Sequence, residues 1–159
     1  MNDHARLNDI KEILEILYGK LGYFQKELAF SSSQSANFEL KQRIKREILP
    51  DIRKYETEYW ELYPQEAIII SDAEAETQLV KVEQAVVSIE KISSDSYSSE
   101  LISLLHDIRD KLDEQDKTAS AKLKLVLPLI PAIASYELEM ETEGLLSKVL
   151  KTIRSKLSR

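Results

Sequence analysis

Large apolar residues recur along the first thirty residues with the spacing of a helix that packs against another helix. The successive steps are 4, 3, 4, 3 and 4 residues, through Ile10, Leu14, Leu17, Leu21, Phe24 and Leu28. This alternation is the heptad pattern of a coiled-coil stripe, which is buried against a partner helix. Asp9 and Glu12 form a capping-box-like pair, so we expect the helix to begin near Asp9. Serines 31–33 end it, because short hydroxyl side chains compete for the helix backbone.

A second apolar stripe predicts a helix from about residue 35 to residue 62. Its members are Leu40, Ile44, Ile48, Ile52, Tyr55, Tyr59 and Leu62. Pro50 lies inside this helix, and because proline lacks an amide and clashes with the preceding turn, we expect a kink or a break near Leu49. A short serine-rich loop joins the two helices, so residues 1–64 are predicted to form an antiparallel helical hairpin.

Two glycines, Gly19 and Gly22, interrupt the first helix beside Tyr18 and Tyr23. Each costs about 1 kcal/mol relative to alanine in a helix interior. They lie off the apolar stripe, and two interpretations stay open. They mark either a flat second face that another chain approaches closely or a tolerated local weakness.

Residues 65–159 are predicted to form a helical C-terminal region. We expect helices at about 72–92, 99–115, 118–127 and 144–159, where apolar residues again have helical spacing. Residues 67–70 are rich in β-branched side chains, and residues 135–142 alternate between polar and apolar. A short strand pair between these two segments is therefore an alternative to helical or irregular structure, although glutamate is a poor strand former. The predicted fold class is all-α for most of the chain.

Composition excludes several classes of function. With 159 residues, 43% of them hydrophobic and 31% charged, the chain suits one domain or two small helical pieces with a real core. There is no cysteine, which excludes disulfides, thiolate catalysis and cysteine zinc sites. The net charge of −6 argues against a nucleic-acid-binding protein. Phosphate-loop, dinucleotide, nucleophile-elbow and zinc-protease motifs are missing, so we expect a protein that is not an enzyme, with no catalytic residues and no cofactor.

Metal binding is not expected either. His106, with Asp107 and Asp110 on the same predicted helix, supplies too few ligands for a catalytic zinc ion. A denser acidic run contains Glu137, Glu139, Glu141 and Glu143. Its carboxylates suit calcium or magnesium, but no glycine-bearing loop arranges them around an ion. A solvent-facing charged run is the favoured interpretation.

The most apolar segment spans residues 123–136. It is 14 residues long and contains Lys124, Pro128 and Pro131, whereas a membrane-spanning helix needs about 20 apolar residues. Residues 144–159 then predict a basic amphipathic helix, which either packs on the protein or lies on an anionic membrane. The candidate membrane-contact residues are Lys148, Lys151, Arg154 and Lys156. The first residues lack the pattern of a secretory signal, so a cytoplasmic location is expected and membrane contact is not favoured.

Aromatic residues gather near the end of the second predicted helix, where Tyr55, Tyr59, Trp60 and Tyr63 fall within nine residues. Tryptophan and tyrosine are enriched at interface hot spots, but large rings also close the end of a core. Both interpretations stay open. The candidate partner-binding residues are Tyr18, Tyr23, Tyr55, Tyr59 and Trp60.

Two stretches carry a resemblance to known proteins. Residues 16–30, ILYGKLGYFQKELAF, and residues 37–44, NFELKQRI, resemble a helical hairpin module of bacterial, especially cyanobacterial, signalling and conflict proteins. The module is similar to effector-associated domains that accompany Toll/interleukin-receptor, caspase-like or STAND ATPase regions. The resemblance covers residues 10 to about 62, and Pro50 departs from the uninterrupted second helix of such a module.

The resemblance implies a non-enzymatic adaptor in a bacterial defence or cell-death pathway. Such an adaptor self-associates as a homo-oligomer or recruits an effector or sensor protein through helical contacts. Two alternatives stay open. The first is a membrane-acting effector that uses residues 123–157, and the second is a helical regulatory subunit of an enzyme.

Overall fold

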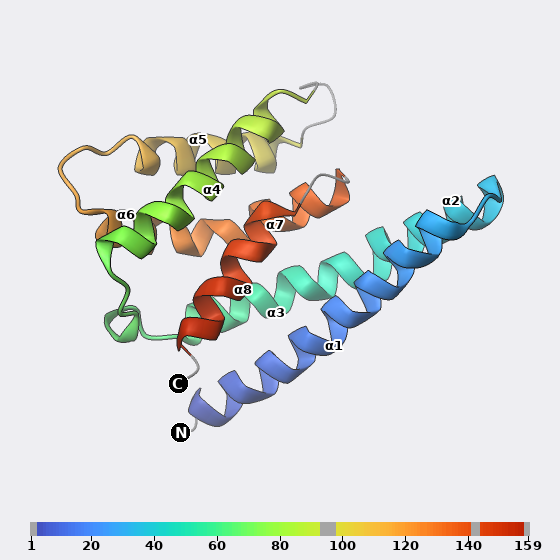
Figure 1. Cartoon of the computed structure of the whole chain (residues 1–159), viewed down its shortest axis with the longest axis horizontal. Coiled ribbons are helices and arrows are strands. Elements are labelled where there is room, and N and C mark those ends of the chain that lie inside the picture. Colours follow the sequence, from blue (N-terminus) through green and yellow to red (C-terminus); the bar gives the residue numbers. More distant parts are fainter. Residues whose placement is uncertain (1–2, 93–97, 141–143, 158–159) are drawn as a thin grey trace. The chain divides into compact units, whose positions relative to one another are not determined.

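The computed structural model describes residues 3–92, 98–140 and 144–157, and all regular structure within these ranges is helical. The all-α prediction is therefore confirmed. The chain divides into two compact units, Met1–Tyr63 and Pro64–Arg159. Figure 1 shows the first unit from blue to cyan and the second from green to red.

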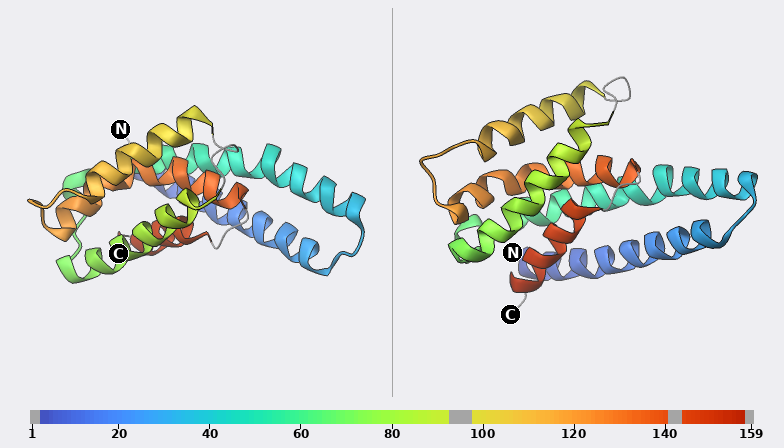
Figure 2. Two further views of the ribbon diagram at one scale, coloured as in Figure 1. Left: turned by 90° about the horizontal axis from the view of Figure 1, so that it is seen from above. Right: turned by 45° about the horizontal axis from the view of Figure 1, so that its top comes forward.

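The first unit is a helical hairpin. Its outgoing helix is α1 (Asp3–Phe30), and its returning run consists of α2 (Gln34–Arg43), the π-helical segment η1 (Ile44–Ile48) and α3 (Leu49–Leu62). Helix α1 packs along α3, and the two lie side by side in Figures 1 and 2. The Ser33 hydroxyl accepts a hydrogen bond from the Ala36 amide and so caps the start of α2.

The predicted heptad stripe is the inner face of α1. Its first four members are buried and its last two, Phe24 and Leu28, are half-buried. The returning run contributes its own buried apolar residues, Ile44, Ile48, Leu49, Ile52, Tyr59 and Trp60. The predicted start near Asp9 is wrong, because α1 already begins at Asp3. The negative charge of Asp3 stabilises this earlier start, since it lies at the positive end of the helix dipole.

Pro50 does not break the returning run. It is the second residue of α3, which follows directly on η1, and the helical backbone continues through this point, since Ile48 and Leu49 both keep right-handed helical dihedral angles. The turn before it is widened, so that the Leu49 amide donates to the Ile44 carbonyl five residues back. The expected kink or break near Leu49 is therefore a short π-helical segment.

The second unit is a cluster of helices around its own core. Its elements are η2 (Gln65–Ala67), α4 (Asp72–Glu90), α5 (Ser99–Leu112), α6 (Ala119–Val126), η4 (Leu127–Leu129), α7 (Ile130–Glu139) and α8 (Leu145–Leu157). Helix α4 packs on α6 and α8, α7 packs on α8, and α5 packs on α6 and α7. Ser71 caps the start of α4, since its hydroxyl accepts a hydrogen bond from the Glu74 amide. Ser98 and Thr118 cap α5 and α6 in the same way.

The strand alternative is wrong within the described residues. Residues 135–139 continue α7, and residues 68–70 are irregular after a 3-10 turn. Residues 141–143 lie outside the described part of the chain. The buried side chains of α7 include Ile130, Ile133, Ala134 and Glu137, which recur every three or four residues. This is the period of a helix face, and it overrides the alternation seen in the sequence.

The apolar segment predicted at residues 123–136 belongs to a longer helical run. Ala119–Glu139 is long and apolar enough, by length and composition, to cross a membrane, and 44% of its most apolar 18-residue window is buried. A core helix meets the same criteria. Four of its residues, Leu123, Val126, Ile130 and Ile133, are no more than 1% exposed and belong to the core of the protein.

Candidate interaction surface

Helix α1 has a second apolar face, directed to solvent. Ile16 and Tyr23 are each 60% exposed, and Phe30 is 85% exposed. Because the three residues are seven positions apart, they share one side of the helix. At about 100° per residue, that side lies nearly opposite the buried stripe. We call Ile16, Tyr23 and Phe30 the outer stripe.

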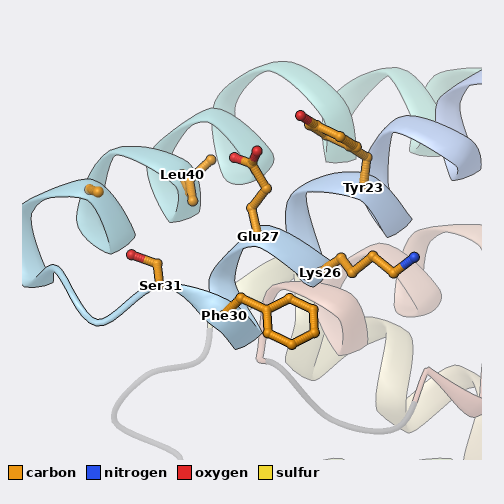
Figure 3. A pocket seen from close by; sticks show the side chains of 7 residues that line it. Tyr23, Lys26, Glu27, Phe30, Ser31 and Leu40 are labelled. Atoms are coloured by element: carbon orange, nitrogen blue, oxygen red, sulfur yellow. The ribbon is translucent and has the colours of Figure 1, made fainter.

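A hollow of about 430 Å³ lies at the tip of the hairpin, where α1 ends and α2 begins. Tyr23, Lys26, Glu27 and Phe30 line it from α1, and Leu40 lines it from α2 (Figure 3). A further ring, Phe38 of α2, is 65% exposed. The tip thus combines exposed aromatic rings with a cation and an anion. This combination suits a protein contact better than a small polar substrate.

Tyr23 is held in place by its neighbours. A hydrogen bond to Glu27, one turn further along α1, raises the pKa of Tyr23 above its ordinary value, and the negative charge of Glu27 adds to this. The Tyr23 ring also meets the Phe24 ring edge-on, with 5.9 Å between centroids. Tyr23 thus contacts Glu27 and Phe24 while most of its side chain stays exposed on the outside of α1.

The glycines of α1 are not required by the packing of the hairpin. A Cβ atom added at Gly19 or at Gly22 meets nothing within 4 Å. Gly19 lines a second hollow, of about 450 Å³, together with Lys20, Tyr23 and, from the returning run, Arg43. The two glycines therefore leave open space on the outside of α1.

The interior of the hairpin contains a carboxylate that sequence reasoning missed. Glu56 of α3 is 1% exposed, and it accepts hydrogen bonds from the Tyr18 hydroxyl at 2.7 Å and from Trp60 Nε1 at 3.2 Å. The predicted stripe placed Tyr55 inward, whereas Tyr55 is half-buried and Glu56 takes the inner position. Glu56 lies four residues after the buried Ile52, and this helical spacing is the sequence signal that predicts an inward position for it.

The predicted aromatic contact residues separate into inner and outer positions. Tyr59 and Trp60 are 4% and 7% exposed, and their rings pack edge-to-face at 4.8 Å. Their burial favours the core interpretation over the interface interpretation for these two residues. Tyr18 is half-buried on Glu56, and Tyr55 is half-buried with the Lys54 ammonium 5.2 Å from its ring. Of the five predicted residues only Tyr23 is exposed, and partner binding by the others stays a prediction.

The basic face predicted for the last helix is interrupted. Lys148, Lys151 and Lys156 are exposed, but Arg154 is 6% exposed and so does not present its charge to a membrane surface. Lys156 pairs with Glu74 of α4 at 3.1 Å. Of the four predicted membrane-contact cations, Arg154 is therefore buried and Lys156 is paired within the second unit.

The acidic run is not simply a solvent-facing ladder. Glu137 is 1% exposed and accepts a hydrogen bond from the Leu146 amide at 2.9 Å, so it caps the first turn of α8. Glu139 is exposed, and Glu141 and Glu143 lie outside the described residues. Among the described residues there is no group of three or more side chains that could hold a metal ion.

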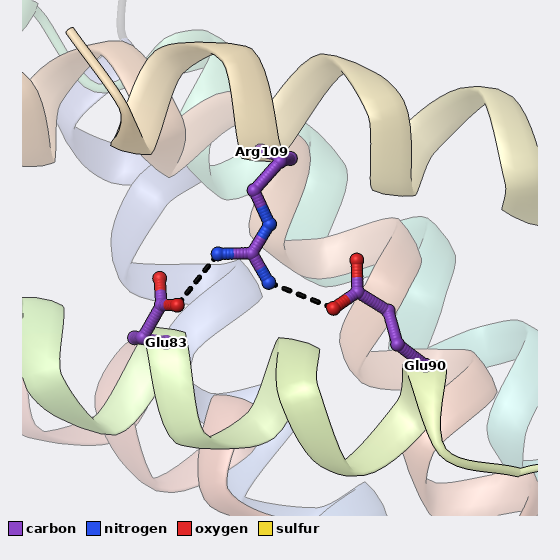
Figure 4. Close-up of polar contacts among 3 residues, drawn as sticks. All are labelled: Glu83, Glu90 and Arg109. Atoms are coloured by element: carbon purple, nitrogen blue, oxygen red, sulfur yellow. Dashed lines mark hydrogen bonds and ion pairs between the residues drawn. The ribbon is translucent and has the colours of Figure 1, made fainter.

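A three-residue ion pair connects two helices of the second unit. Arg109 of α5 donates to Glu83 at 2.5 Å and to Glu90 at 2.7 Å, both on α4 (Figure 4). The hydrogen bond to Glu83 is the main cause that raises the pKa of Arg109 above its ordinary value. The guanidinium thus acts as a brace between α4 and α5, because its fork can bind both carboxylates at once.

Comparison of the chain with known proteins gives no matching family model, no matching curated protein and no matching solved structure. The resemblance of residues 10–62 to effector-associated adaptor domains therefore remains an expectation from the sequence.

Proposed function

We propose that the chain is a non-enzymatic protein-interaction module that self-associates or recruits an effector through the outer face of its hairpin. The observation that carries this proposal is the outer stripe beside the hollow at the hairpin tip. Single exposed apolar residues are ordinary on a protein surface. A row of them along one helix, next to a hollow with aromatic lining, is typical of a surface that another protein covers.

The wider setting that we propose is bacterial defence or cell-death signalling. It rests on the resemblance of residues 10–62 to effector-associated domains. In this setting the hairpin is the contact element, and Tyr23 is the one predicted contact residue that lies on the outer stripe.

Photo-crosslinking in cells tests the proposed function. A photoreactive amino acid replaces Phe30 or Phe38 in the full chain, and the matched controls carry it at Val80 or Ile102, which are 48% and 43% exposed on α4 and α5. We expect protein adducts from the hairpin positions and few from the controls. An absence of adducts at Phe30 and Phe38, or equal yields at all four positions, contradicts the proposal.

A membrane-acting effector is a second candidate function, favoured by the length and apolar composition of Ala119–Glu139. Flotation of the full chain with anionic liposomes tests it. Lack of binding at low salt removes this candidate, because electrostatic attraction to anionic lipid is strongest there.

A further inference from the structure

We draw no further inference here: the strongest candidate, the outer stripe of α1 with the hollow at the hairpin tip, is an exposed apolar face, and nothing in the structure shows what covers it.

Discussion

The hydrogen bond from Tyr18 to Glu56 is expected to stabilise the hairpin by about 1.5 kcal/mol. Tyr18→Phe keeps the ring and removes only the hydroxyl, which lies 2.7 Å from the carboxylate. Hydrogen bonds to charged groups contribute about 1.5–3 kcal/mol. We expect the lower end of this range, because Trp60 Nε1 still donates to Glu56 at 3.2 Å after the substitution.

A double-mutant cycle isolates this bond. Glu56→Ala leaves two donors without their buried acceptor and removes a packed side chain, so it should cost about 3 kcal/mol. In that background Tyr18→Phe has little left to remove, and its effect should fall to a few tenths of a kcal/mol. The resulting coupling energy is about 1.5 kcal/mol, within the range of contacting residues.

Urea unfolding of the full chain measures these differences. Trp60 is the only tryptophan in the sequence, so its fluorescence follows the unfolding of the hairpin in particular. Tyr55→Phe is the matched control, since it removes a hydroxyl from a half-buried ring on α3, and it should cost less than about 0.5 kcal/mol. The reasoning is refuted if Tyr18→Phe costs no more than this control, or if its full cost persists in the Glu56→Ala background.

Four further predictions concern stability. Glu137→Ala should lower the free energy of unfolding by about 2 kcal/mol, because it removes the buried cap of α8; thermal unfolding by circular dichroism checks this. Arg109→Lys should lower the free energy of unfolding, by the same assay, because one ammonium lacks the fork that binds both glutamates. The loss should be less than about 1 kcal/mol, because solvent screens these partly exposed pairs. Arg6 of α1 pairs with Glu58 of α3, and the hydrogen bond between them is the main cause that lowers the pKa of Glu58. The ionised Glu58 therefore stabilises the fold fully above the ordinary glutamate pKa, and this stabilisation is lost as the pH falls through the lowered pKa. The stability difference between wild type and Glu58→Gln, measured by urea unfolding, should therefore shrink from about pH 7 to about pH 3. Gly22→Ala should raise the stability of the monomer by about 1 kcal/mol in dilute solution, where thermal unfolding measures it without self-association.

The helices of this chain are predictable because their local signals agree. The apolar spacing of α1, the hydroxyl cap at Ser71 and the short serine link all lie within a few residues of the element that they specify. The strand alternative failed where one local signal, the alternation at residues 135–142, stood alone. The burial of Ile133, Ala134 and Glu137 follows the helix period there, since tertiary packing selects the face that is covered.

The candidate surface is only partly predictable from the sequence. The sequence predicts Tyr23 as a contact residue. Ile16 and Phe30 lie seven residues to either side of it, but this spacing falls outside the heptad stripe of Ile10, Leu14, Leu17 and Leu21. Glu56 and Arg154 show the opposite problem. A charged side chain is ordinarily assigned to solvent, and its burial depends on partners that are distant in sequence, as Tyr18 is from Glu56 by 38 residues.

The π-helical segment gives the returning run a phase correction. Apolar residues 40, 44, 48 and 52 are spaced by four, and in an α-helix each such step drifts by about 40° around the axis. The widened turn at Ile44–Ile48 rotates the chain less per residue and cancels part of this drift, so both ends of the run keep an apolar side toward α1. The segment is thus equivalent to a one-residue insertion that the helix has absorbed. Deletion of one exposed residue from it, combined with replacement of Pro50, should therefore yield a regular α-helix with the same inner face, whereas the same deletion within α3 should turn Glu56 and Trp60 away from Tyr18.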